Sequence, residues 1–251
     1  MLPPRLPLTA SRTKHWSWPR AACYAMLLVA ATAALAGAAP DAGGTALDRY
    51  LDGMKSLRTA FTQTVTDARG TQVEAGAGTL LVLRPGKFRW DYQPRAEASV
   101  ADKDQPSPAP PPTTGAQSGQ LLVADGKNLW FYDRELAQVS VKPVAAALTA
   151  TPIMLLSGSA AQLHDSFEIT PAAPHDGLDW VSVQPRGADG DFSHAELGFA
   201  HDRLARMVVN DRLGQTVVLD FSASERNARI DSAELQFKAP AGVDVIGTPQ
   251  S

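Results

Sequence analysis

Histidine followed by aspartate is the residue pairing in this chain that could support acid–base or metal chemistry. It occurs three times, as His164-Asp165, His175-Asp176 and His201-Asp202. An imidazole beside a carboxylate can be a general base with its orienting partner, or two ligands of zinc. The sequence places each pair at a turn, however, where such residues are favoured for backbone reasons. We therefore expect neither a metal-binding nor a catalytic role for them.

The familiar signatures of nucleophilic and nucleotide-binding enzymes are missing from the sequence. The chain contains no G-x-S-x-G, no H-E-x-x-H, no Walker loop and no C-x-x-C. Ser157-Gly158-Ser159 lacks the strand-turn-helix context of a serine nucleophile, and we interpret it as the end of a helix. The sequence predicts a protein that is not an enzyme and has no cofactor. A lipid hydrolase is an alternative that turnover of an ester substrate would reveal.

Binding chemistry is indicated more strongly, by the stretch "RPGKFRWDY" at residues 84–92. After a turn at Pro85 and Gly86, the rings of Phe88, Trp90 and Tyr92 alternate with charged residues. Alternate side chains of a strand point to opposite faces, so one face of this strand is aromatic. Arg84, at the entrance to the strand, is either a solvated arginine beside a turn or a donor to backbone carbonyls of a segment that covers the aromatic face.

The N-terminal residues read as an export signal. Residues 1–20 carry four basic and no acidic residues, and residues 21–39 are uncharged and rich in alanine. Small residues near Ala36 and Ala38 fit a cleavage site, so we predict a signal peptide at residues 1–38 and a single mature domain at 39–251. An uncleaved membrane anchor is the competing interpretation, because the uncharged run approaches the length of a spanning helix.

Charge and cysteine content narrow the partners and the source of stability. Without residues 1–38 the chain keeps 19 basic and 26 acidic residues, a net charge of −7 that disfavours nucleic acid. The only cysteine, Cys23, lies in the predicted signal. The mature domain therefore has no disulfide and no catalytic thiol, and its stability must come from an ordinary hydrophobic core.

The order of predicted elements indicates a mainly β protein. Helical spacing predicts one amphipathic helix from Thr45 to Lys55. About eleven short antiparallel strands follow, as in a sandwich or barrel, with Asp125-Gly126 as a strong hairpin signal. Between the sixth and seventh strands, Pro143 and Pro152 are expected to begin two short helices. The four residues after Pro152, Ile153 to Leu156, are all apolar and too many for one face of a short helix.

A proline-rich stretch at about residues 96–119 interrupts this pattern. It contains five prolines and no hydrophobic periodicity, so we predict a disordered insertion between two strands. A linker between two domains is less favoured, because strands of the same style resume immediately after it.

Aromatic strands combined with separate small helices suggest a sheet whose concave side is covered by a lid. A cavity beneath such a lid would be lined by rings and aliphatic side chains and would suit an apolar ligand. The alternative is that these side chains form an ordinary core. The residues that we predict to line the cavity are Leu51, Met54, Phe61, Phe88, Trp90, Tyr92 and Trp130.

Five segments in order give the chain a family resemblance. They are "FTQTVTD", "GAGTLLVLRPGKFRWDY", "LLVADGKNLWFYD", "TPIMLLSG" and "FKAPAGVDV", which together span most of residues 45–246. In this order the chain resembles the LolA family, periplasmic carriers of lipoproteins in Gram-negative bacteria. The proline-rich stretch departs from that family, in which the corresponding connection is short.

The resemblance implies an unclosed antiparallel β-barrel of about eleven strands with an α-helical lid. It implies that Arg84 is the arginine that hydrogen-bonds the closed lid and that Phe88 and Trp90 are cavity aromatics. It further implies that Pro152, Ile153, Met154 and Leu155 are lid residues that gate the cavity.

The function implied by the resemblance is shielding of the acyl chains of lipoproteins in the periplasm. The implied partners are acylated lipoproteins, the Lol ATP-binding-cassette transporter complex at the inner membrane and the receptor LolB at the outer membrane, with the carrier a monomer. A related carrier of another lipid, or a sensor of envelope lipids, is the alternative on the same architecture.

Overall fold

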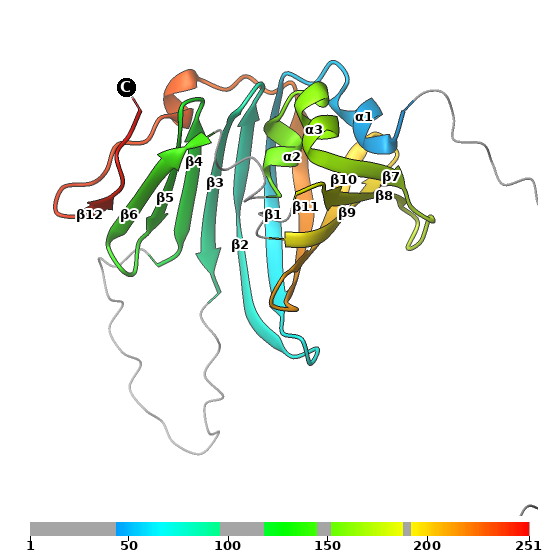
Figure 1. Ribbon diagram of the computed structural model, residues 1–251, viewed down its shortest axis with the longest axis horizontal. Coiled ribbons are helices and arrows are strands. Elements are labelled where there is room, and N and C mark those ends of the chain that lie inside the picture. The colour runs from blue at the N-terminus through cyan, green and yellow to red at the C-terminus, as the bar shows by residue number, and fades with distance from the viewer. Residues whose placement is uncertain (1–43, 96–117, 145–151, 188–191, 251) are drawn as a thin grey trace, which may run out of the picture. The chain divides into compact units, whose positions relative to one another are not determined.

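The computed structural model describes residues 44–95, 118–144, 152–187 and 192–250 (Figure 1). The predicted signal peptide lies outside these residues, as does nearly all of the predicted insertion. Of the helix predicted after Pro143, only the first residues are described. No helix among the described residues is both long and apolar enough to span a bilayer.

The fold is built on one large sheet. The strands that precede Pro152 are β1 (Ser56–Thr66), β2 (Gln72–Leu83), β3 (Lys87–Pro94), β4 (Gln120–Asp125), β5 (Asn128–Asp133) and β6 (Gln138–Pro143). Those after it are β7 (Phe167–Pro171), β8 (Asp179–Pro185), β9 (Phe192–Ala200), β10 (Arg203–Asp211), β11 (Thr216–Arg226) and β12 (Asp244–Ile246). The helices are α1 (Ala46–Leu51), α2 (Met154–Ser157), α3 (Ala160–Ser166) and the short 3₁₀ helix η2 (Ser232–Leu235).

Neighbouring strands follow the order β12-β6-β5-β4-β3-β2-β1-β11-β10-β9-β8-β7, and the two end strands do not pair with each other. The mainly β, unclosed sheet predicted from the sequence is therefore confirmed. Eleven strands pair antiparallel, as predicted, but β12 was not expected. It pairs in parallel with β6 over three residues at one edge of the sheet.

The predicted helices differ from the observed ones in length and number. α1 ends at Leu51 rather than at Lys55, because Gly53 adopts a positive φ of 65° that a helix cannot continue through. α3 was not predicted, although its capping box is visible in the sequence. The Ser159 side chain accepts from the backbone of Gln162, whose own side chain accepts from the backbone of Ser159.

Strand register defines two faces of the sheet. Trp90 lies opposite Leu80 on β2 and Leu122 on β4. Phe88 lies opposite Val82, and Phe61 lies opposite Gly78. We call the face that carries these side chains the inner face. It forms the main hydrophobic core together with buried residues of α1, α2 and α3. We call these three helices, residues 52–54 after α1, Pro152 and Ile153 before α2, and the residues joining α2 to α3 the lid.

Glycines of β2 create room for aromatic rings on the inner face. Phe61 from β1 and Tyr92 from β3 flank Gly78, and the ring of Phe61 stacks on that of Trp90 with a centroid distance of 3.8 Å. A Cβ atom at Gly78 would lie 2.5 Å from the Phe61 ring. The absence of a side chain at this position is therefore what allows the rings to meet across the strand.

The variant Gly78→Val tests this packing. The added side chain would collide with the Phe61 ring and the β3 backbone, so we expect the free energy of unfolding in urea to fall by about 2 kcal/mol or more. Ala77→Val, the exposed neighbour on the opposite face, is the matched control and should leave stability nearly unchanged. Equal stability of the two variants would contradict the close approach of the ring.

Candidate functional site

Arg84 joins the β2–β3 turn to two segments of the lid. Its Nη1 donates to the carbonyl oxygens of Leu51 at 2.6 Å and Met54 at 3.3 Å, at the end of α1. Its Nη2 and Nε donate to the carbonyl oxygen of Gly158, at 2.8 and 3.2 Å. These contacts match the interpretation of Arg84 as a donor to the backbone of a covering segment, because every acceptor is a backbone carbonyl.

The chemistry of helix ends explains this geometry. The last carbonyls of a helix have no partner within the helix, and they carry its partial negative charge. A guanidinium offers five donors in a rigid fork, so it can serve two such ends at once. Desolvation by burial lowers the pKa of Arg84, but an arginine remains protonated at physiological pH. A backbone bond from Gly86 to the carbonyl of Ser157, 2.8 Å long, adds to the same junction.

The apolar run after Pro152 is buried on every side. Ile153, Met154, Leu155 and Leu156 are between 0 and 3% exposed, although α2 is only four residues long. In Figure 1, α2 lies in front of the central strands of the sheet. Because the sheet extends on both sides of α2, residues all around the helix contact apolar surface. The lid thus inserts its own side chains into the space enclosed by the inner face.

An apolar cavity of about 240 Å³ remains between the lid and the sheet. The residues that line it are Gln63, Trp90, Leu122, Pro152, Ile153, Phe192, Val209, Asp211, Val217 and Leu219. Of the predicted site residues, Trp90, Pro152 and Ile153 line this cavity. The others on the inner side are buried in the core around it, namely Leu51, Met54, Phe61, Phe88, Tyr92, Met154 and Leu155.

Trp130 does not belong with this group, and its assignment to the cavity is wrong. Leu122, which lies opposite Trp90, faces Phe131 on β5, so Trp130 points to the outer face. There its ring packs against Phe237 with a centroid distance of 5.4 Å, and its Nε1 donates to Asp125 at 2.8 Å. Trp130 therefore stabilises the outer side of the sheet.

Several cavity residues were missed in the sequence. Val209, Val217 and Leu219 follow the alternation of β10 and β11, which was recognised as strand pattern but not traced to a face. Gln63 also follows the alternation of β1, two residues after Phe61. Because it is polar, like the threonines beside it, it was not assigned to the inner face. The signal was therefore the period of two in each case.

The histidine–aspartate pairs do not converge on a site. His175 and His201 lie at turns, as predicted, but His164 lies in α3. Its Nε2 is 2.8 Å from Asp48 Oδ1 in α1, where it connects two parts of the lid. Among the residues that the structure describes, no group of three or more histidine, cysteine, aspartate or glutamate side chains could hold a metal ion.

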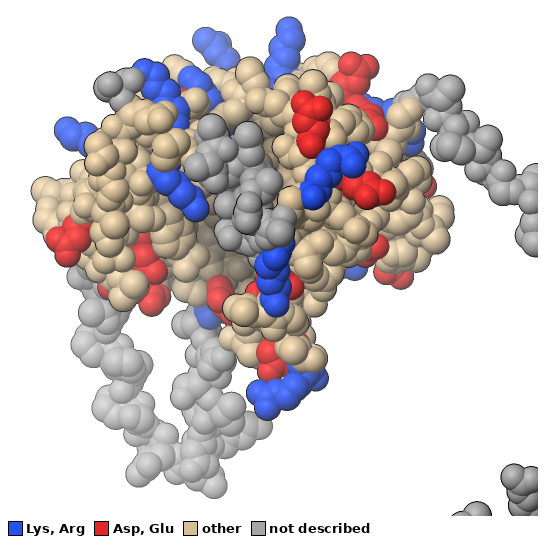
Figure 2. Space-filling model, in the orientation of Figure 1, with Lys and Arg blue, Asp and Glu red and all other residues tan. Residues whose placement is uncertain are grey.

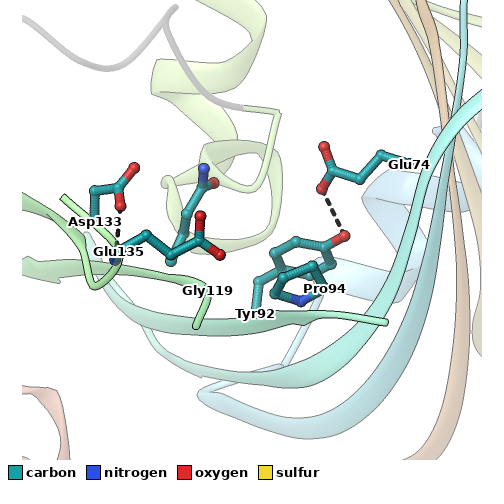
Figure 3. Close-up of a pocket in the computed structure, with 7 residues that line it drawn as sticks. Glu74, Tyr92, Pro94, Gly119, Asp133 and Glu135 are labelled. Atoms are coloured by element: carbon teal, nitrogen blue, oxygen red, sulfur yellow. Dashed lines mark hydrogen bonds between the residues drawn. The ribbon is translucent and has the colours of Figure 1, made fainter. Parts of the chain in front are cut away.

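Charged side chains of both signs are interspersed on the face of the molecule shown in Figure 2. A second hollow lies beside the cavity, at the ends of β2, β3 and β5, and has a volume of about 170 Å³. Its lining includes the acidic side chains of Glu74, Asp133 and Glu135 and the ring of Tyr92 (Figure 3). Apolar and polar lining thus meet near the rim of the inner face.

The sequence matches a known protein family over most of its length. The family described as "Outer membrane lipoprotein carrier protein LolA" matches residues 52–106 and 113–238. Outer-membrane lipoprotein carrier proteins of Chromobacterium violaceum and Methylobacillus flagellatus are 36% and 33% identical to the chain. The first alignment covers 89% of the chain and 97% of the relative, and the second covers 82% and 89%.

Solved structures resemble the chain more distantly. The crystal structure of the LolA superfamily protein NE2245 from Nitrosomonas europaea superposes with a TM-score of 0.40 at 11% identity, covering 76% of this chain and 96% of that protein. Since this similarity is low, the assignment depends on the sequence matches, which extend over nearly the full length of both partners. The chain belongs to the LolA family of outer membrane lipoprotein carrier proteins.

Proposed function

We propose that the chain is a periplasmic carrier that binds the acyl chains of lipoproteins in the space between the lid and the sheet. The observation that carries this proposal is an apolar cavity between the sheet and the lid. Hydrogen bonds from Arg84, and not strand pairing, hold the lid to the sheet. The family's description as a lipoprotein carrier supports it. The predicted signal peptide fits a route into the periplasm.

The size of the cavity indicates how cargo would enter. Ligand pockets commonly enclose about 300–1,000 Å³, whereas the cavity here is about 240 Å³ with the lid side chains in place. Acyl chains therefore replace Ile153 to Leu156 rather than add to them. We propose that Arg84, Pro152, Ile153, Met154 and Leu155 form the gate and that the inner-face residues contact the cargo.

The energetics suit a carrier that must also release its cargo. Each methylene removed from water contributes about 0.8 kcal/mol, so acyl chains need shielding in the aqueous periplasm. Entry of the chains, however, expels lid side chains from the same space into water, and the free energy that this costs cancels part of the gain. The result is a shallow free-energy well, from which an acceptor can withdraw the cargo.

The direction of transport follows from this balance. A bilayer solvates hydrocarbon as well as the cavity does, so extraction from the inner membrane requires work by a donor. We propose that the donor is the Lol ATP-binding-cassette complex and that the acceptor is LolB at the outer membrane. The chain acts as a monomer without a cofactor and performs no covalent chemistry.

Filling the cavity tests the binding site. Val209→Trp places an indole in the cavity, so we expect the affinity for a palmitoylated peptide to fall tenfold or more in fluorescence titration. Val208→Trp, on the neighbouring residue of the opposite face, is the control and should bind as the parent does. Urea unfolding establishes that both variants are folded. Equal binding by parent and Val209→Trp would contradict the assignment of the cavity.

Removing the guanidinium tests the gate. Arg84→Leu loses four donor contacts to lid carbonyls, and bonds from a charged donor contribute roughly 1.5–3 kcal/mol each. Because the closed lid competes with cargo, we expect amide exchange in residues 153–158 to rise about tenfold or more. We also expect acylated peptide to be held more tightly and transferred to acceptor vesicles more slowly.

Arg206→Leu is the control for this experiment, because Arg206 pairs with Asp220 between β10 and β11, away from the lid. It should change neither exchange in the lid nor peptide release. Native mass spectrometry of protein taken from the periplasm identifies the cargo directly. Acylated polypeptide supports the carrier, whereas free lipid alone would favour a carrier or sensor of another lipid.

A further inference from the structure

Gln63 is a polar residue in the wall of an otherwise largely apolar cavity. The other polar residue of the wall, Asp211, is engaged in its own hairpin. Its Oδ1 accepts from the backbone of Leu213 at 2.8 Å and of Gln215 at 2.7 Å. The inner-face positions before and after Gln63 on β1, Phe61 and Val65, are buried hydrophobic residues. A glutamine at this position is half-buried and interrupts an apolar row.

The side chain of Tyr92 reaches toward Gln63 across a glycine. Gln63 lies opposite Gly76 on β2, and Gly76 lies opposite Pro94 on β3. A Cβ atom at Gly76 would lie 2.5 Å from the Tyr92 ring, so Tyr92 extends over the glycine toward β1. The Tyr92 hydroxyl donates to Glu74 Oε1 at 2.6 Å, as Figure 3 shows. The three side chains thus lie in a row, Glu74, Tyr92 and Gln63.

The hydroxyl of Tyr92 is the middle group of this row and can bond to both neighbours. Burial, and then the hydrogen bond to Glu74, raise the pKa of Tyr92, whereas a hydrogen bond from the Gln63 side chain lowers it. Tyr92 therefore stays protonated at physiological pH, and its hydroxyl donates the hydrogen bond to Glu74. Its oxygen keeps a lone pair that can accept from the amide nitrogen of Gln63, the side chain that lowers this pKa. When the nitrogen is used in this way, the amide carbonyl oxygen of Gln63 is available as an acceptor for a molecule in the cavity.

Gln63 lies where the apolar cavity meets the polar hollow. Gln63 lines the apolar cavity, whereas Tyr92 and Glu74 line the polar hollow beside it. An acylated polypeptide has the same sequence of chemistry: hydrocarbon, then a polar linkage, then peptide. An amide that enters an apolar site without a hydrogen bond carries a desolvation cost. A single acceptor at the boundary would remove that cost.

We propose that Gln63 is the subsite for the linkage of the cargo, where its carbonyl oxygen accepts a hydrogen bond from the amide N–H that joins an acyl chain to the polypeptide. This proposal rests on the carrier function proposed above. Tyr92 is a positioning residue that orients the Gln63 amide. The subsite gives the carrier a means to distinguish an acylated polypeptide from a membrane lipid of equal chain length, which hydrophobic contact alone cannot do.

A pair of matched probes tests the subsite. The first is a peptide with an N-palmitoyl amide at its terminus, and the second is its ester analogue, in which oxygen replaces the linking N–H. For the purified full chain we expect the amide to bind about tenfold more tightly than the ester, as one hydrogen bond of ordinary strength predicts. In Gln63→Leu the two probes should bind equally, with the ester bound as in the parent.

Two further variants separate positioning from structure. Tyr92→Phe keeps the ring but loses the hydroxyl, so it should retain ester binding and lose most of the preference for the amide. Gln184→Leu, an exposed glutamine of β8, is the control and should keep the parent's preference. Urea unfolding checks each variant, and Tyr92→Phe provides the test should Gln63→Leu fail to fold.

The outcomes distinguish the subsite from the carrier function. Should the parent bind both probes with the same affinity, or should both Gln63→Leu and Tyr92→Phe keep the tenfold preference, the subsite is refuted while the carrier function stands. Should the parent bind neither probe, the carrier function itself is refuted. Loss of the preference with unchanged ester binding supports the subsite.

Discussion

The hydrogen bonds of Arg84 to backbone carbonyls connect the sheet to a lid that no strand pairing secures. An open sheet with a hydrophobic inner face must cover that face, and here the covering consists of helices of four to seven residues. Helices so short are not stable alone. The burial of their apolar side chains and the guanidinium at their ends therefore supply the stability that their own backbone bonds cannot.

We propose that this arrangement makes the interior exchangeable. In most proteins the core belongs to the same elements that define the fold. Here the residues Ile153 to Leu156 fill the space but belong to a segment that hydrogen bonds from Arg84 and Gly86 hold at its end. Their side chains are chemically similar to acyl chains, so the protein can replace one by the other with a small change in free energy. The inner-face rings of Phe61 and Trp90, stacked across Gly78, would form the wall of the cavity both when lid side chains fill it and when acyl chains do.

The strands and the position of Arg84 could be predicted from the sequence because the pattern around them is unambiguous. In β3, charged residues alternate with Phe88, Trp90 and Tyr92, so only one register buries the rings. In β5 the run from Leu129 to Tyr132 is apolar throughout, and either face could have been the inner one. That ambiguity explains why Trp130 was placed on the wrong side.

Other features depend on contacts between residues far apart in the chain. The parallel pairing of β12 with β6 involves three residues with no strong strand pattern, and the register alone reveals it. The helical spacing of α1 continues to Met54 in the sequence, but Gly53 ends the helix, and the carbonyls thus released are those that Arg84 binds. Gln63 stood in the right alternation, yet the role that we propose for it depends on Gly76 and Tyr92 in two other strands.

The exchange of lid side chains for acyl chains is tested most directly by photo-crosslinking with a palmitoylated peptide that carries a diazirine at the end of its acyl chain. Mass spectrometry then locates the adducts. We expect them on the inner face, at Trp90, Leu122, Val209 and Val217, with competition by unlabelled peptide. Saturable adducts on the outer face, around Trp130 and Val141, would contradict the account.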